Sequence, residues 1–173
     1  MNKRLLVLAL AVVLATSAAA LDFDQKQWYG QGVLALPMGD FGDIANIGFG
    51  AGVGISVPSS PELGFRGEIS YIHFTTEDVE GGDYSFSMIP VVFLAEYDLD
   101  SAYLLGGLGI IWRKTKIEFD EDEFFGGSVS DTDTELGLIL GGGLALSPSM
   151  NLEARLNIIS DSNFLSAHVG FKF

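Results

Sequence analysis

Hydrophobic and polar residues alternate most regularly in the C-terminal part of the chain. There, Leu165, Ala167, Val169, Phe171 and Phe173 alternate with Phe164, Ser166, His168, Gly170 and Lys172. Because successive side chains of a β-strand point to opposite faces, this segment predicts a strand with one almost wholly apolar face. An apolar edge strand invites aggregation in a soluble protein, whereas in a transmembrane barrel it faces lipid and closes the ring.

Seven further strand-like segments precede this one. We place the eight segments at residues 27–36, 47–57, 63–74, 84–99, 102–116, 134–147, 151–159 and 164–173. Short turn-like connections at 58–61, 98–101 and 147–151 alternate with longer acidic ones at 37–46, 75–83 and 116–134; the last connection, 160–163, is short where a long one is expected. The pattern predicts an all-β fold, an eight-stranded antiparallel up-and-down transmembrane β-barrel with its termini in the periplasm.

The same alternation assigns faces to individual strands. In 47–57, large residues alternate with glycines and Ser56, which suits a narrow barrel with a filled interior. The residues expected to face lipid are Ile47, Phe49, Ala51, Val53, Ile55, Val57, Phe65, Gly67, Ile69, Tyr71, Leu104, Leu108, Ile110, Trp112, Leu152, Ala154, Leu156 and Ile158. Tyr71, Tyr97, Trp112, Phe171 and Phe173 are expected in interfacial aromatic girdles. Segment 27–36 shows no clean alternation, and Pro90 predicts a bulge or local distortion.

Residues 1–20 have the layout of a secretory signal peptide. Lys3 and Arg4 precede an apolar run, which small residues follow up to Ala20. Cleavage there leaves 21–173 as one barrel domain with seven basic and 23 acidic residues, a net charge of −16. Such an acidic domain excludes nucleic acid as a partner. The absence of cysteine from the sequence excludes disulfides and thiol chemistry.

Six charged residues are expected to point into the lumen near the periplasmic turns. They are Arg66, Glu68, Glu96, Glu153, Arg155 and Lys172, three positive and three negative. Since isolated buried charges are costly, the simplest interpretation is a plug of salt bridges. The alternative is a gated pore that opens when the pairs exchange. Arg113 is expected nearer the external rim, paired with acidic loops.

Acidic residues gather in the long connections. They are Asp40 and Asp43 in the first, Glu77, Asp78, Glu80 and Asp83 in the second, and Glu118, Asp120, Glu121, Asp122, Glu123, Asp131, Asp133 and Glu135 in the third. Carboxylate clusters suit Ca²⁺, but residues 120–126 carry Phe124 and Phe125 where a calcium loop needs an oxygen ligand and a glycine. A solvated acidic loop is therefore expected, with no metal and no cofactor.

Catalytic chemistry has few candidates. His73 and His168 are the two histidines, and neither has a serine and an acid at an evident spacing. Lipid A deacylases, which are outer-membrane barrels of similar size, place a histidine two positions before a Ser-Asn pair. Here Ser160 occupies that position before Ser162-Asn163, so the motif fails at its essential residue.

The strand rhythm, the Phe-terminated last strand and the first loop, Pro37-Met-Gly-Asp-Phe41, resemble the OmpA/OmpX-like family of eight-stranded outer-membrane barrels. The resemblance implies a place in the outer membrane of the Gram-negative cell envelope, among lipids and lipopolysaccharide. It also implies that Leu165, Val169, Phe171 and Phe173 form the signal read by the barrel-insertion machinery.

We therefore expect a non-enzymatic barrel with a charge-plugged lumen. Its expected role is structural, or lies in surface interactions through acidic loops with cations, lipopolysaccharide or a surface partner. The rival functions are a small porin-like channel for ions or small solutes and, third, a lipid-modifying enzyme. The competing fold is a soluble secreted barrel of lipocalin type, which would have to place the charges and the glycines outside and would leave no convincing binding cavity.

Overall fold

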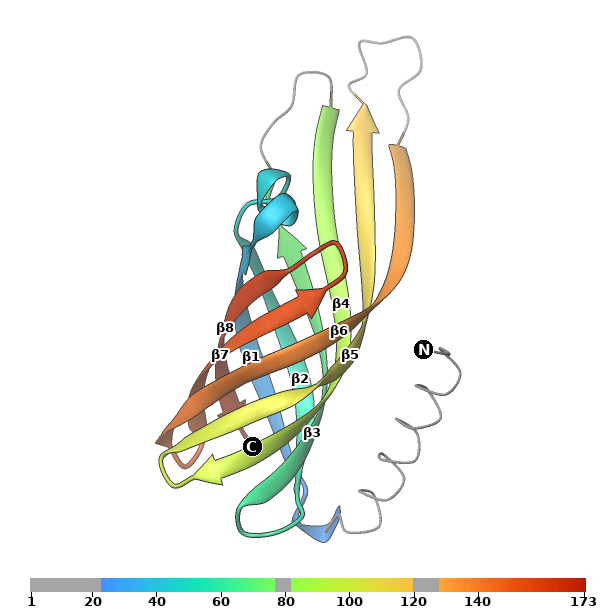
Figure 1. Ribbon diagram of the computed structural model, residues 1–173. Coiled ribbons are helices and arrows are strands. Elements are labelled where there is room, and N and C mark those ends of the chain that lie inside the picture. Colours follow the sequence, from blue (N-terminus) through green and yellow to red (C-terminus); the bar gives the residue numbers. More distant parts are fainter. Residues whose placement is uncertain (1–22, 77–81, 120–127) are drawn as a thin grey trace, which may run out of the picture.

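The computed structural model describes residues 23–76, 82–119 and 128–173. Eight antiparallel strands form a closed barrel in which β8 pairs with β1 (Figure 1). The strands are β1 (Gln27–Pro37), β2 (Gly48–Pro58), β3 (Leu63–Phe74), β4 (Gly82–Leu99), β5 (Ala102–Phe119), β6 (Ser128–Ser147), β7 (Met150–Ile159) and β8 (Phe164–Lys172). Two 3₁₀ helices are η1 (Phe23–Gln25) and η2 (Gly39–Asp43). The predicted eight-stranded up-and-down barrel is confirmed, whereas the predicted signal peptide lies outside the described residues.

The two ends of the barrel differ. At one end, the turn end, strands are joined through residues 59–62, 100–101 and 148–149, and β8 finishes there. At the other, the loop end, the connections are 38–47, 75–81, 120–127 and 160–163. Strands β4, β5 and β6 contain 18, 18 and 20 residues and extend past the others at the loop end (Figure 1). A tilted membrane strand needs only about 9–11 residues, so these three strands are longer than a bilayer crossing requires.

Most strand boundaries lie within three residues of the sequence-based expectation, although Asp83 and Glu118 fall in β4 and β5 rather than in the adjoining loops; the start of β6 differs most. Strand β6 begins at Ser128, six residues before the expected Thr134, and it pairs with β5 throughout. Asp131 and Asp133, assigned from the sequence to a loop, are therefore strand residues, as is Glu135. Because these residues are polar, the strand could not be recognised here from the sequence. Apolar and polar residues alternate only in the part of a strand that faces lipid or the core.

The predicted faces are largely confirmed by exposure. On β3, Ile69 and Tyr71 are exposed while Arg66 and Glu68 are buried. The five expected girdle residues, Tyr71, Tyr97, Trp112, Phe171 and Phe173, are all exposed. Val57 is the exception: it lies on β2, which contacts η1, and is buried.

Strand β1 does alternate, although its sequence does not reveal it. Tyr29, Gln31, Val33 and Ala35 are buried, while Trp28, Leu34 and Leu36 are exposed. The two faces were indistinguishable from the sequence because both mix apolar residues with polar ones or glycine.

At Pro90, pairing with β3 is interrupted. Ile69 pairs with Val91 and Ile72 with Met88 in one unchanged register, with no pairs between them, while Pro90 still pairs with Ile111 of β5. The local distortion expected at Pro90 is present, but the ladder resumes without a bulge. Proline lacks only its backbone N–H, which would donate to one of the two neighbouring strands.

Within residues 23–76, 82–119 and 128–173, no helix has the length and hydrophobicity to cross a membrane. The barrel interior holds two layers of side chains of different chemistry, which come mainly from β1, β3, β4, β5, β7 and β8.

Candidate functional site

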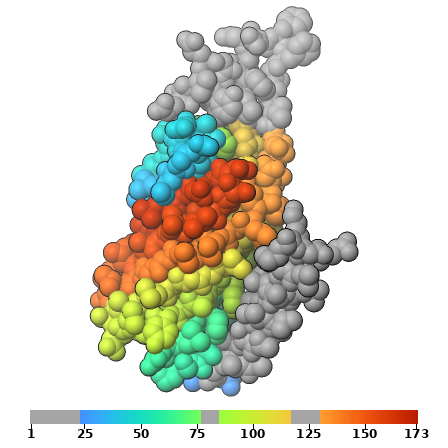
Figure 2. Space-filling view, in the orientation of Figure 1, coloured from blue at the N-terminus to red at the C-terminus, as the bar shows by residue number. Residues whose placement is uncertain are grey.

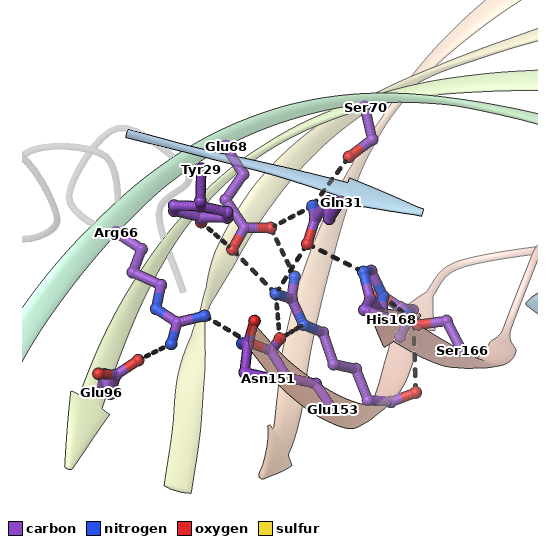
Figure 3. Close-up of polar contacts among 12 residues, drawn as sticks. Tyr29, Gln31, Arg66, Glu68, Ser70, Glu96, Asn151, Glu153, Ser166 and His168 are labelled. Carbon is purple, nitrogen blue, oxygen red and sulfur yellow. Dashed lines mark hydrogen bonds and ion pairs between the residues drawn. The ribbon is translucent and has the colours of Figure 1, made fainter. Parts of the chain in front are cut away.

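The first layer is a network of buried polar side chains toward the turn end of the lumen (Figure 3). Its members occupy inward positions on β1, β3, β4, β5, β7 and β8, which the closed barrel brings together although they are far apart in the sequence. They are Tyr29, Gln31, Arg66, Glu68, Ser70, Glu96, Tyr103, Asn151, Glu153, Arg155, Ser166 and His168. We call this set the polar layer.

Arg155 joins the two halves of the polar layer. Its Nη1 and Nη2 donate to the two carboxylate oxygens of Glu68 at 2.6 and 2.9 Å. Its Nε donates to Oε2 of Glu153 at 2.8 Å, and its Nη2 also contacts that oxygen. All three side chains are less than 5% exposed. Bidentate, charge-assisted pairing of this kind compensates the charges of these three side chains, which the fold removes from water.

Arg66 is the second cation of the layer. Its Nη1 donates to Oε1 of Glu153 at 2.5 Å, and its Nη2 forms an ion pair with Glu96. The guanidinium carbon also lies 5.5 and 5.0 Å from the ring centroids of Tyr29 and Tyr103. Stacking on both rings holds the guanidinium by cation–π attraction as well as by charge pairing.

Neutral donors complete the coordination of the two buried glutamates. The Tyr29 hydroxyl donates to Glu68 at 2.5 Å and the Tyr103 hydroxyl to Glu153 at 2.7 Å. Asn151 Nδ2 donates to the same oxygen of Glu153 at 2.6 Å. With donors on every side, Glu68 and Glu153 are anchored more rigidly than ion pairs alone would achieve.

Two glycines make room for these tyrosines. A Cβ placed on Gly54 would lie 2.5 Å from the Tyr29 ring, and one on Gly143 would overlap the Tyr103 ring. The alternation of glycine with large residues in β2 therefore has a specific cause: a Cβ at the interior glycine positions would overlap neighbouring side chains or backbone.

The structure brings together five of the six charged residues expected in the lumen. Lys172 differs: it is half-buried and forms no ion pair within the part of the chain that the structure describes. The uncharged Tyr29, Tyr103 and Asn151 were not anticipated from the sequence. Tyr29 lies on β1, whose faces the sequence did not assign.

His168 belongs to the polar layer. Its Nε2 lies 2.9 Å from Ser166 Oγ and its Nδ1 lies 3.2 Å from Gln31 Oε1. The arrangement is a serine and a histidine oriented by an amide, but Ser166 is 2% exposed and His168 is 6% exposed. Both side chains are enclosed in the polar layer, where their hydrogen bonds satisfy buried polar atoms. His73 lies on the outer face of β3, half-buried.

The second layer, toward the loop end, is apolar. Buried side chains from six strands pack against Phe41 and Ala45, which enter from the connection after β1. Phe41 is 1% exposed, and its ring centroid lies 5.1 Å from that of Phe74 and 6.1 Å from that of Phe86, both edge-to-face. We call the cluster Val33, Ala35, Phe41, Ala45, Ile72, Phe74, Phe86, Met88, Ile111, Ile159 and Phe164 the apolar layer. The connection containing η2 (cyan) covers this end of the barrel beside β7 and β8 (Figure 2).

Arg113 lies in the extended part of the barrel. Its Nη2 is 3.1 Å from Asp133 and 3.2 Å from Glu135, and Ser162 Oγ donates to Glu135 at 3.3 Å. The expected pairing of Arg113 with nearby acids therefore occurs, with strand residues rather than loop residues.

The acidic connections are described in part. Asp40 and Asp43 are exposed, and both lie in η2. Residues 77–81 and 120–127, including the calcium-like run, lie outside the described residues. Among the residues described, no group of three or more histidine, aspartate or glutamate side chains is arranged to hold a metal ion.

Comparison with known proteins identifies the kind of barrel. The family model described as outer membrane protein beta-barrel domain matches residues 6–173. Among curated proteins, no match to the sequence was found.

Solved structures share the fold at low sequence identity. The attachment invasion locus protein Ail of Yersinia pestis is 17% identical, with a TM-score of 0.64 over 86% of this chain and 97% of its own. Neisserial surface protein A is 18% identical, with a TM-score of 0.60 over 86% and 97%. The N-terminal barrel of Pseudomonas aeruginosa OprF is 11% identical, with a TM-score of 0.52 over 85% and 97%. These likenesses support the architecture described above.

Proposed function

Because the chain belongs to the family of outer membrane protein β-barrel domains, we propose that it serves the bacterial outer membrane as a sealed, non-enzymatic barrel. Its role is structural or surface-interactive, with acidic loops presented outside the cell. The observation that carries the proposal is the filling of the lumen by two successive layers, one polar and one apolar. An eight-stranded barrel is just wide enough for side chains to fill, so each layer suffices to block the passage of ions.

The polar layer is the sealing element in this proposal. Arg66, Glu68, Glu96, Glu153 and Arg155 form ion pairs with one another in the lumen, so an ion that entered would have to separate them. The apolar layer blocks the lumen a second time, because a hydrated ion gains nothing from a cavity lined by Phe41, Phe74 and Phe164. Exchange of partners within the polar layer alone therefore leaves the lumen closed.

The proposed orientation places the turn end in the periplasm and the loop end outside. Outer-membrane barrels have short periplasmic turns and longer external loops, which matches the difference between the two ends. The extended parts of β4, β5 and β6 then project from the cell surface. Their acidic connections, together with exposed Asp40 and Asp43, would meet cations, lipopolysaccharide or a surface partner.

The last strand is the proposed insertion signal. Leu165, Val169 and Phe171 are exposed on the outer face of β8, and Phe173, directly after the strand, is exposed too. The backbone N–H of Phe173 donates to Trp28 O of β1 at 3.0 Å. The side chains of these four residues remain accessible to lipid and to the insertion machinery while the backbone closes the ring.

Ion flux from proteoliposomes tests the sealed state. Vesicles loaded with a potassium-sensitive dye and containing the folded protein should leak no faster than empty vesicles. The Glu68→Gln variant should remain as tight, because the apolar layer is intact. The rival function, a small channel, requires that potassium leak through the wild-type protein and that the rate of leakage change when Glu68 is neutralised.

A further inference from the structure

The outer face of the barrel carries a polar, cationic band directly above its lipid-facing surface. Ladder pairs align His73 of β3 with Ser87 of β4, Ser87 with Lys114 of β5, and Lys114 with Thr132 of β6. The next row toward the loop end aligns Ser85, Lys116 and Ser130 in the same way. Paired residues of antiparallel strands share a face, so all seven side chains lie on the same outer surface.

The apolar boundary beneath this band is equally clear. Tyr71, Ile89 and Trp112 are exposed one row nearer the turn end. Exposed Ile69, Val91, Ile110 and Leu136 follow in the next row. Tyrosine and tryptophan mark the interface between hydrocarbon and headgroups in membrane proteins. The cationic band therefore begins where lipid headgroups begin.

The cations of the chain are distributed unevenly. Arg66, Arg113 and Arg155 pair with acids inside the barrel, and Lys172 occupies an inward position. Lys114 and Lys116 are the two basic residues that the strands carry on their outer face. In a chain with a net charge of −14, the placement of exposed Lys114 at the headgroup level indicates an anionic neighbour.

The surface is also hollowed at this place. A groove of about 380 Å³ is lined by residues of the two rows and of the aromatic boundary. Lys114 is exposed and, within the described residues, has no hydrogen-bond or ion-pair partner. Lys114 and Lys116 lie two residues apart on one strand face, about 7 Å, and hydroxyls flank both on the neighbouring strands. Ammonium and hydroxyl groups are the donors that bind phosphate oxygens.

We propose that this groove on the outer face of β3–β6 binds the phosphorylated headgroup of an outer-leaflet lipid, with Lys114 as the principal contact and Trp112 against the lipid's upper acyl region. His73, Ser87 and Thr132 complete the donor set. The site gives the barrel a fixed lipid neighbour on one side. This proposal rests on the outer-membrane location and orientation proposed above, but not on the sealing of the lumen.

Lipid binding by the full folded chain in detergent micelles tests the proposal. The probe is diphosphoryl lipid A, measured by native mass spectrometry and by tryptophan fluorescence, with dephosphorylated lipid A and inorganic phosphate in parallel. One lysine near a membrane surface contributes enough to change affinity about fivefold. Lys114→Gln should therefore weaken binding of diphosphoryl lipid A about fivefold, and Lys114→Arg should retain it.

Lys26→Gln provides the matched control. Lys26 is exposed but precedes β1 at the opposite end of the barrel, so its loss should leave the affinity unchanged. Equal weakening by Lys26→Gln and Lys114→Gln would overturn the proposal, as would equally tight binding of dephosphorylated lipid A. Displacement of the lipid by millimolar inorganic phosphate would show a site for free phosphate instead. Ion-tight vesicles with no lipid site would refute this inference and leave the sealed lumen standing.

Discussion

Arg155→Met is the substitution that most sharply tests the polar layer. In the wild-type protein Arg155 pairs with both Glu68 and Glu153, at distances down to 2.6 Å. After the substitution Glu153 keeps Arg66, Tyr103 and Asn151 as partners. Glu68 keeps only the neutral donors Tyr29 and Gln31, so its charge remains buried without a counterion.

The expected cost follows from that imbalance. Removing one partner of a buried ion pair typically costs about 3–5 kcal/mol, because the remaining charge stays buried and uncompensated. We expect a loss of this size in the free energy of unfolding of Arg155→Met. The double variant Arg155→Met/Glu68→Gln should recover most of the loss, since the orphaned charge is gone.

Equilibrium urea unfolding in lipid vesicles, followed by tryptophan fluorescence, measures these differences. Trp28 and Trp112 are exposed on the outer surface and report departure from lipid. Arg113→Met is the comparison variant: its partner Asp133 is 53% exposed, and its other partner, Glu135, keeps a hydrogen bond from Ser162, so its removal should cost less than the removal of Arg155. Equal losses for Arg155→Met and Arg113→Met, or no recovery in the double variant, would refute the reasoning.

Three further predictions concern packing and closure. Gly54→Ala forces the new methyl group against the Tyr29 ring and should destabilise the barrel by about 1–3 kcal/mol in the same unfolding assay. Gly32→Ala, whose new methyl group would have nothing within 4 Å, should not destabilise it. Equal effects of the two substitutions would contradict this account of the glycines. Phe41→Ala should lower the free energy of unfolding by about 3 kcal/mol or more, because it empties the centre of the apolar layer. Vesicles containing this variant should nevertheless stay ion-tight, and a leak would show that the polar layer does not seal the lumen alone. On gels, unboiled protein from the outer-membrane fraction should migrate faster than boiled protein, and recovery from the soluble fraction without such a shift would contradict the membrane assignment.

Much of the fold could be predicted because lipid imposes a strict alternation. In β7 and β8 the outward residues, such as Leu152 and Val169, are apolar and the inward residues, such as Glu153 and His168, are polar, so strand and face were both readable. Where contact with lipid no longer requires apolar residues on one face, the alternation that reveals a strand in the sequence is lost. Residues 128–133 of β6 are paired with β5 but read as a polar loop, and β1 carries apolar residues on both faces.

The charged part of the site was also predictable, because an inward charge in a narrow barrel must find a partner. Arg66, Glu68, Glu153 and Arg155 were identified from parity alone. The apolar layer was not, since Phe41 lies in a connection and nothing in its sequence neighbourhood indicates that it turns into the barrel. Tyr29 and Tyr103 were missed because a tyrosine suits either a lipid girdle or a buried hydrogen bond.

Single-channel recording in planar bilayers tests the sealed lumen most directly. The folded wild-type protein, inserted at a density verified by its gel shift, should give no discrete conductance steps above the bare bilayer, and Glu68→Gln should give none either. Reproducible steps from the wild-type protein, altered in size by Glu68→Gln, would contradict the two-layer closure and establish a channel through the polar layer.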